Sequence, residues 1–432
     1  MSSSADLWDR LLSTERLRSS SEPARGDEGN DFLSDYQRVV FSSSFRRLQD
    51  KTQVTPLATS DFLRRRLTHS VEVSVVGERM GRVLARRLKN RLPDGHQRDR
   101  FGKVVATACL LHDLGNPPFG HEGEQAVRAW ADEQNLESAD YRGFDGNAQG
   151  FRIAVRLQHQ GKGYGMNLTA ATLATMLKYP RVPTEEETSN PKRRKRGKWS
   201  VMSSEEHHYE RVRQIIGLEP GARHPLSFVV EAADDIVNRL VDIEDALKVK
   251  LVSFEDVCDA LASVSGAKAK ELKDQMVERR DELDQDDREM LAYQRFRVNA
   301  GAALAESCEN LFEEEVDRFE ARSFDKALVE ACELSELYSA IESLENAKIF
   351  GDSEIVRVEA GGKAAISKLL NLLYDEVCAG TKLGATVPTY LTLDHEEEDD
   401  ELTSVRRVVD YVSGMTDRFA VTLYQQLSGT SL

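Results

Sequence analysis

Hydrophobic residues recur at three- and four-residue spacing along most of this chain, which is the spacing of an amphipathic α-helix. One stripe contains His69, Val73, Val76, Met80 and Val83. A second stripe contains Phe101, Val104, Val105, Ala108, Leu111 and His112. A third helix is expected from about residue 227 to 248, with Val229, Ala233, Ile236, Leu240, Ile243 and Leu247 on its apolar side. The first two helices therefore each present a histidine on an apolar face.

Strand-like alternation is sparse, and KIFGDSEIVRVE at residues 348–359 is the one stretch that suggests a small β-hairpin. Residues 1–31 are rich in Ser, Arg and Glu and predict an extended, flexible N-terminal arm. A highly charged region at 267–346 keeps helical periodicity and has few Gly or Pro residues. We therefore predict a mostly α fold, with a core at 32–250 and a helical C-terminal region at 251–432.

The charge of the chain limits the classes of partner. The 74 acidic and 58 basic residues among 432 give a formal charge of −16, which argues against a dedicated duplex-DNA binder. A local basic pocket for an anionic ligand remains compatible with an acidic chain. The hydrophobic fraction of 40% is enough for a sizeable core.

The cysteines and the N-terminus indicate the compartment. The five cysteines form no CxxC pair and are odd in number, which is typical of a reduced cytosolic protein. The N-terminal MSSSADLWDRLL lacks the basic and apolar regions of a signal peptide, and no apolar run approaches 18 residues. We therefore expect a cytoplasmic protein without a membrane span.

Residues 110–124, LLHDLGNPPFGHEGE, concentrate the ionisable groups. An apolar helix leads into His112-Asp113, two prolines end it, and His121 and Glu124 follow. A histidine on an apolar helix face is usually a core residue. Two such histidines and an aspartate, however, form the ligand set of a divalent metal ion.

A fourth ligand is expected from the acidic stripe at residues 231–245. Periodicity alone leaves Asp234, Asp235 and Asp242 open as that ligand, and read by itself the stripe would be a solvated helix face.

Seven ordered segments resemble the HD-domain metal-dependent phosphohydrolases, and more narrowly the dGTPase, or deoxynucleoside triphosphate triphosphohydrolase, family. They are SSSFRRLQDKTQV (42–54), RLTHS (66–70), LLHDLGNPPFGHEGE (110–124), GFDGNAQGFR (143–152), LKYPR (177–181), EAADDIVNRLVDIEDAL (231–247) and DYVSGMTDRF (410–419). The resemblance implies an HD-domain helical fold for the core. It also implies that the C-terminal region completes the substrate pocket and the oligomer contacts.

The same resemblance assigns the metal ligands as His69, His112, Asp113 and Asp234, because the family ligand is the first aspartate of the pair. The ion would be Mg²⁺, Mn²⁺ or Co²⁺. His121 and Glu124 match the family's catalytic pair. A carboxylate and an imidazole three residues apart on a helix can share a face and move protons.

Substrate contacts carried over from the family involve cations, amides and a carboxylate, since a triphosphate is strongly anionic. They are Gln53, Arg66, Lys178, Tyr179, Lys195 or alternatively Lys198, Asn238 and Asp242. Two positions depart from the usual pattern, because Asn238 replaces a common tyrosine and Asn116 a common histidine. The basic run around Lys195 could also be a solvated loop, and contact with nucleic acid is not indicated by the chain as a whole.

The implied reaction is hydrolysis of a deoxynucleoside triphosphate, with dGTP the favoured guess, to the deoxynucleoside and inorganic triphosphate. The implied assembly is a homo-oligomer, often a hexamer in this family. One alternative is another HD-domain nucleotide phosphohydrolase or phosphodiesterase. The HDxxED pattern of (p)ppGpp hydrolases is absent, since Asn116 and Pro117 stand in its place. A second alternative is a catalytically silent nucleotide-sensing or nucleic-acid-associated regulator.

Overall fold

The protein is represented by a computed structural model, which describes residues 4–18, 31–54, 57, 63–93, 97–158, 165–284, 287–388 and 401–430. The α-helices are α1 (Ser4–Leu11), α2 (Asp31–Val40), α3 (Ser43–Arg47), α4 (Arg66–Arg87), α5 (Gln97–Leu111), α6 (Gly120–Glu133), α7 (Ala139–Arg142), α8 (Gly146–Arg152), α9 (Ala170–Thr175), α10 (Glu185–Ser189), α11 (Pro191–Arg196), α12 (Glu206–Ile216), α13 (Pro225–Lys248), α14 (Phe254–Ala262), α15 (Ala267–Glu282), α16 (Arg288–Glu314), α17 (Val316–Glu320), α18 (Leu328–Ala331), α19 (Ser335–Lys348), α20 (Ser353–Cys378), α21 (Glu401–Ser413) and α22 (Asp417–Ser428). Short turns of other helix types are η1 (Leu48–Asp50), η2 (Ile153–Leu157), η3 (Ser203–Glu205) and η4 (Gly384–Thr386).

The predicted mostly α fold is confirmed. Throughout these ranges no β-strand forms, and extended pairing is limited to two isolated bridges. The same ranges contain no helix long and apolar enough to cross a membrane.

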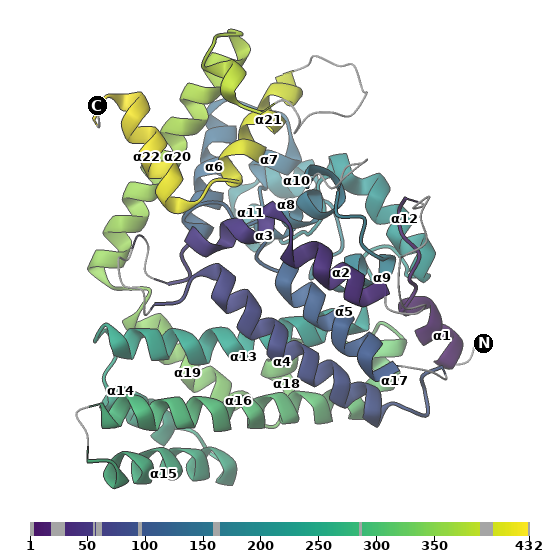
Figure 1. The fold of residues 1–432 in the computed structure, drawn as a ribbon, viewed down its shortest axis with the longest axis vertical. Coiled ribbons are helices and arrows are strands. Elements are labelled where there is room, and N and C mark those ends of the chain that lie inside the picture. Colours follow the sequence, from purple (N-terminus) through teal and green to yellow (C-terminus); the bar gives the residue numbers. More distant parts are fainter. Residues whose placement is uncertain are drawn as a thin grey trace.

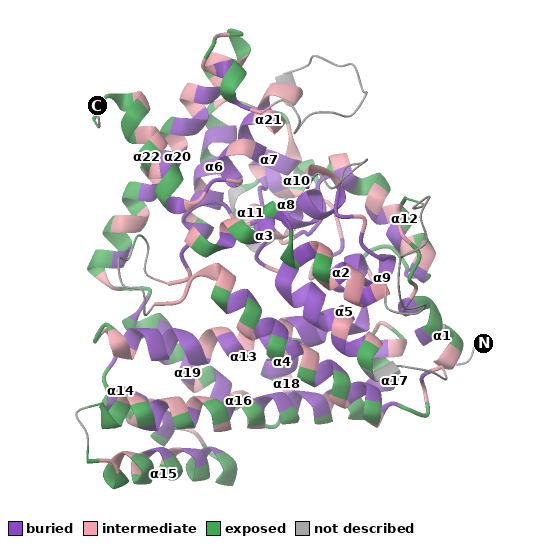
Figure 2. Cartoon of the chain, in the orientation of Figure 1, coloured by how far each residue is buried: buried purple, intermediate pink, exposed green. Residues whose placement is uncertain are grey.

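Helices α4, α5 and α13 form the centre of the larger hydrophobic core, and α16 and α15 add further layers beyond α13 (Figure 1). Helices α4 and α5 approach closely because small residues line their contact. A Cβ atom placed on Gly77 would lie 2.5 Å from the Cys109 sulfur, so only glycine fits there. Figure 2 shows α5 almost entirely buried, whereas α15 exposes much of its surface.

Helix α20 packs on α6, α21 and α22 pack on α20, and the four helices contribute to a second hydrophobic cluster. Trp130 of α6 is fully buried in this cluster, which also contains Leu370 of α20 and Val409 of α21. Gly362 of α20 lies against the Phe119 ring, which directly precedes α6. Residues from the end of the chain therefore support the segment that carries His121 and Glu124 (Figure 1).

Two local predictions differ from the structure. The β-hairpin expected at 348–359 is wrong, because this stretch contains the end of α19, a turn and the start of α20. Asp352 caps α20 by accepting the backbone N–H groups of Glu354 and Ile355. The segment expected as an extended arm forms helix α1 with a buried Trp8, whereas residues 19–30 lie outside the described part of the chain.

Candidate active site

Three core helices bring three potential metal-binding groups together. His69 lies in the first turn of α4, and Asp234 lies midway along α13. His112 is the residue immediately after α5. Their ligand atoms all lie within 4.8 Å of one another. The Asp234 Oδ1 atom is 3.0 Å from His69 Nε2 and 3.4 Å from His112 Nε2.

A hydrogen bond to Nδ1 of His112 determines which ring nitrogen faces the cluster. His112 Nδ1–H donates to the Cys109 carbonyl oxygen at 2.6 Å, so Nε2 is the ring nitrogen left to face the cluster. A backbone acceptor of this kind orients metal-binding histidines. The buried end of α5 thus turns Nε2 of His112 towards Asp234, and a metal ion would bind there in place of the Nε2 proton.

Asp113 lies beside this cluster and is held by two neighbours. Its Oδ2 atom accepts a hydrogen bond from Arg66 Nη1 at 2.7 Å and is 3.5 Å from His112 Nε2. Its Oδ1 atom accepts from the Asn116 amide. Asn116, which replaces the histidine that is common in the family, can therefore still orient Asp113.

The electrostatics of the cluster favour a bound cation. Burial alone would raise the pKa of Asp234, but His112 and His69 lower it to about 2. Burial opposes protonation of His112, yet the Asp234 and Asp113 carboxylates raise its pKa to about 9. Two imidazoles and two carboxylates that attract positive charge fit a divalent metal ion. Asp235 and Asp242, the other acidic candidates, do not belong to the three-residue cluster found among the described residues.

His121 and Glu124 lie one turn apart at the start of α6. Their Nδ1 and Oε2 atoms are 3.0 Å apart, and the His121 side chain is 67% exposed while Glu124 is buried. Burial alone would raise the pKa of Glu124, but His121, Arg128 and the Gly146 N–H lower it. The ionised carboxylate therefore accepts from His121 Nδ1–H and leaves His121 Nε2 for a reacting group.

A cavity of about 240 Å³ lies on one side of the metal-ligand cluster. Its lining combines amides, histidines, carboxylates and aromatic rings. The lining residues are Thr52, Gln53, Val54, Arg66, His69, His112, Asp113, Phe119, Gly120, His121, Asp234, Asn238, Asp242, Phe350 and Glu359. We call this space the amide cavity. It contains most of the residues that the sequence assigned to substrate.

A second cavity, of about 210 Å³, lies on the other side of the cluster and shares His112, Asp113 and Asp234 with the first. Its further lining residues are Asn116, Asn147, Thr175, Met176, Lys178, Tyr179, Lys198, Ser227, Val230 and Glu231. We call this space the lysine cavity. Lys195 belongs to α11, and its side chain lies outside the described part of the structure, so Lys198 is the lysine of this run that lines a cavity.

Lys178 in the lysine cavity is held by carboxylates of α13. Its ammonium group is 3.0 Å from Glu231 Oε1, and Arg223 binds the other oxygen of Glu231 at 2.9 Å. The same ammonium group lies 5.7 Å from the centre of the Tyr179 ring. Lys178 is therefore both charged and fixed in position.

Gln53 and Asn238 form a pair in the amide cavity. Gln53 Nε2 donates to Asn238 Oδ1 at 2.9 Å, so the residue that replaces the common tyrosine holds a neighbouring side chain. Gln53 Oε1 is buried, and within the described ranges it accepts no hydrogen bond. This oxygen is a ready acceptor for a ligand hydroxyl.

Several supporting residues were missed by sequence reasoning because they come from distant parts of the chain. Phe350 and Glu359, from the α19–α20 region, line the amide cavity. The buried Asp417 of α22 accepts from the backbone N–H groups of Thr52 at 2.8 Å and Phe119 at 3.0 Å. Asp417 lies in the DYVSGMTDRF segment that resembles the family, but no local sequence pattern predicts its contacts.

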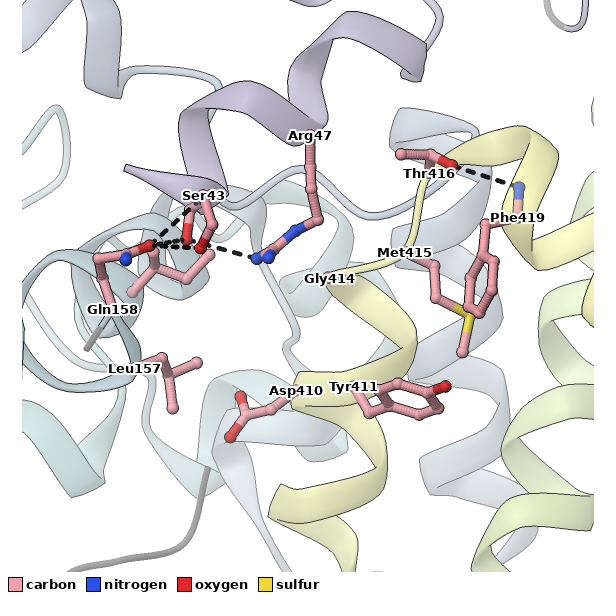
Figure 3. A pocket seen from close by; sticks show the side chains of 12 residues that line it. Ser43, Arg47, Leu157, Gln158, Asp410, Tyr411, Gly414, Met415, Thr416 and Phe419 are labelled. Carbon is pink, nitrogen blue, oxygen red and sulfur yellow. Dashed lines mark hydrogen bonds between the residues drawn. The ribbon is translucent and has the colours of Figure 1, made fainter. Parts of the chain in front are cut away.

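A third cavity, of about 460 Å³, lies between α3, the η2 turn and the α21–α22 connection (Figure 3). Figure 3 shows Arg47, Gln158 and Phe419 around it, with Ser43 beside Gln158. This cavity shares no lining residue with the amide or lysine cavity. It is therefore distinct from the metal-ligand cluster.

An all-helical core that presents two histidines and neighbouring aspartates in this way defines an HD domain. The model of the HD domain family matches residues 66–291, and that of the phosphohydrolase-associated domain matches residues 333–426. The chain belongs to the HD-domain family of deoxyguanosinetriphosphate triphosphohydrolase-like proteins, as the resemblance predicted.

Individual relatives match over almost their whole length. The deoxyguanosinetriphosphate triphosphohydrolase-like protein of Synechocystis sp. is 34% identical over 98% of this chain and 100% of the relative. A protein of the same description from Listeria innocua is 32% identical over 98% of this chain and 100% of the relative. The deoxyguanosinetriphosphate triphosphohydrolase of Klebsiella pneumoniae is 29% identical over 98% of each chain.

Proposed function

We propose that this HD-domain hydrolase cleaves deoxynucleoside triphosphates, with dGTP the first substrate to test, into the deoxynucleoside and inorganic triphosphate. The observation that carries the proposal is the meeting of two chemically different cavities at His112, Asp113 and Asp234. The amide cavity suits the sugar and base, and the lysine cavity suits a polyphosphate. A substrate that spans both places its α-phosphorus beside the metal ligands.

Cationic side chains flank this position on both sides. Arg66 lines the amide cavity, and Lys178 and Lys198 line the lysine cavity. A divalent ion held by His69, His112, Asp113 and Asp234 would polarise the phosphoryl oxygens and lower the pKa of a bound water. Fixed positive groups stabilise the charge that develops during phosphoryl transfer.

His121 and Glu124 are proposed to move the protons of the reaction. Glu124 holds the Nδ1–H of His121, and His121 Nε2 is the atom available to exchange a proton with water or with the leaving 5′-oxygen. General acid–base catalysis by a positioned pair contributes roughly 10²–10⁴-fold to such reactions. The same pair was assigned by family resemblance, and its geometry supports that assignment.

The test is to incubate the purified protein with each dNTP and with Mg²⁺, Mn²⁺ or Co²⁺ in ¹⁸O-water, and to separate the products. We expect deoxynucleoside and triphosphate, with ¹⁸O in the triphosphate, because attack at the α-phosphorus transfers the water oxygen there. Release of a nucleoside monophosphate and pyrophosphate would refute the cleavage position. On family resemblance alone we also propose a homo-oligomer, which light scattering of the same preparation would test.

A further inference from the structure

Two carboxyl groups from different helices meet behind the amide cavity. Asp242 of α13 lies two turns beyond the metal-ligand candidate Asp234 and lines the cavity. Glu345 of α19 packs behind it, within hydrogen-bonding reach of the Asp242 carboxyl group. Asp242 is 3% exposed and Glu345 is fully buried, so neither charge is hydrated.

Each of these carboxyl groups keeps one buried oxygen without a donor. The oxygens are Asp242 Oδ1 and Glu345 Oε1, for which no hydrogen-bond partner occurs in the described part of the chain. The other oxygen of Glu345 accepts from Arg239 Nη1 at 2.6 Å. Two ionised carboxylates offer only acceptors to each other, whereas one proton between them turns a repulsive contact into a hydrogen bond.

The surrounding charges do not neutralise a second carboxylate. Arg239 lowers the pKa of both carboxyl groups, but it also binds Glu342 at 2.8 Å. Tyr338 of α19 contacts Arg239, and Tyr293 of α16 donates to the Leu240 carbonyl oxygen. Asp245, one turn further along α13, is paired with Arg64 at 2.7 Å and with Lys248 at 2.9 Å.

We propose that Asp242 and Glu345 share a single proton, so that Asp242 faces the substrate cavity as a neutral carboxylic acid. Glu345 then acts through Asp242 as a positioning residue. The positioning role of Glu345 rests on the proposed function, whereas the shared proton does not.

The consequence for substrate binding follows from charge. Burial, and for Asp242 also the neighbouring Glu345, raises the pKa of both carboxyl groups. A neutral Asp242 offers hydrogen bonds to a sugar hydroxyl without adding a negative charge next to a polyanionic substrate. Glu345 stabilises the neutral state of Asp242 because Glu345 itself carries the negative charge of the pair. Glu345 also binds Arg239, which would otherwise favour an ionised Asp242.

The shared proton is tested by the pH dependence of stability, measured by urea unfolding of the full chain between pH 5 and 7. The folded protein retains a proton that the unfolded chain releases near pH ~4. Stability from a raised carboxyl pKa is therefore lost as pH rises towards the folded pKa. Because unfolding releases this proton, the equilibrium constant for unfolding should increase about tenfold for each unit by which the pH rises. Asp242→Asn should remove that factor, and an unchanged slope in this variant would overturn the proposal.

The positioning role is tested by steady-state kinetics of Glu345→Gln with dGTP. The glutamine amide can donate to Asp242, which then ionises, so we expect KM to rise about tenfold at pH 7 with kcat changed less than twofold. Glu342→Gln is the matched control, since Glu342 also binds Arg239 but is not assigned to the cavity, and its KM should stay unchanged. An unchanged KM in Glu345→Gln would overturn the positioning role. If wild-type protein turned over no dNTP, the proposed function would fail, and the unfolding slopes would still decide the shared proton.

Discussion

At the scale of single residues, His112 and Asp113 are chain neighbours with different partners. His112 is fixed by the Cys109 carbonyl oxygen, and Asp113 is fixed by Arg66 and Asn116. These partners orient the two side chains, but they cannot supply the metal-ligand atoms in place of His112 and Asp113. The pair is therefore the most direct place to test metal dependence.

We predict that His112→Ala and Asp113→Ala each lose bound metal and retain below ~1% of wild-type turnover, because changing even a residue that only orients a metal ligand costs about 10–100-fold. Metal per chain, measured by mass spectrometry, and dNTP turnover are the readouts. His207→Ala, at an exposed position of α12, serves as the control and should match wild type. Full turnover in either ligand variant would remove the basis of the proposed site.

Gly120 is a second informative residue because a side chain there would collide with Arg66. Its φ is +52°, and an added Cβ atom would lie 2.6 Å from Arg66 Nη2. Gly221 has φ +76° and no atom within 4 Å of an added Cβ, so it isolates the backbone effect. Both Gly→Ala variants should lose about 1–2 kcal/mol of stability from the left-handed backbone.

We predict that only Gly120→Ala also lowers dNTP turnover, by at least ~10-fold, since displacing Arg66 disturbs both Asp113 and the phosphate contact. Thermal unfolding and steady-state kinetics measure the two effects separately. Equal turnover in Gly120→Ala and Gly221→Ala would show that the Arg66 position is not critical.

At the scale of helices, periodicity predicted α4, α5 and α13 and the face on which each carries a site residue. Asp234, Asn238 and Asp242 lie on successive turns of α13 and all line the amide cavity. Helical spacing predicts that these three residues share one side of the helix, but the acidic stripe taken by itself predicts a solvated face. Helices α4, α5, α16 and α19 all pack on α13, and these contacts have no local sequence signal.

The wrong hairpin at 348–359 has a physical cause. Alternating apolar residues in a short stretch fit a strand, but here they belong to the end of one helix and the start of another. The Asp352 cap begins α20 within this stretch, and the packing of α20 on α6 determines its conformation. Tertiary contact therefore outweighed a local pattern of only a few residues.

The crossing of α20 and α6 gives a prediction with an adjacent control. A Cβ atom on Gly362 would lie 2.4 Å from the Phe119 ring, whereas one on Gly361 would have no atom within 4 Å. We predict that Gly361→Ala stabilises the protein by about 0.5–1 kcal/mol, as expected for a helix interior. Gly362→Ala should instead destabilise it by about 1–3 kcal/mol and slow turnover, because Phe119 precedes the helix of His121. Urea unfolding and dNTP kinetics test both, and equal stability of the two variants would contradict the close contact.

At the scale of the whole molecule, an acidic chain places cationic side chains around its candidate active site. The formal charge is −16, yet Arg66, Lys178 and Lys198 line the two cavities at the metal ligands. Net charge therefore says little about the ligand, as expected when charge is distributed unevenly. The regions matched by the two family models also meet in space, since α20 packs on α6 and supplies Glu359 to the lining of the amide cavity.

Asp417 is the residue that links the end of the chain to this centre. Its Oδ2 atom accepts from the Thr52 N–H and hydroxyl groups, and its Oδ1 atom accepts from the Phe119 N–H. Thr52 and Phe119 both line the amide cavity. Asp417→Asn replaces one acceptor by an NH₂ group that faces an N–H donor, so one of these two contacts must break.

We predict that Asp417→Asn lowers stability by about 1–3 kcal/mol, the cost of an unsatisfied buried group, and lowers dNTP turnover by about 10-fold. Asp256→Asn is the matched control, because Asp256 Oδ2 also accepts from a backbone N–H and a hydroxyl, both of Ser253, but within a local cap of α14. That variant should lose stability without losing turnover. If Asp417→Asn unfolded less readily than Asp256→Asn and kept full turnover, the C-terminal helices would not control the cavity through this residue.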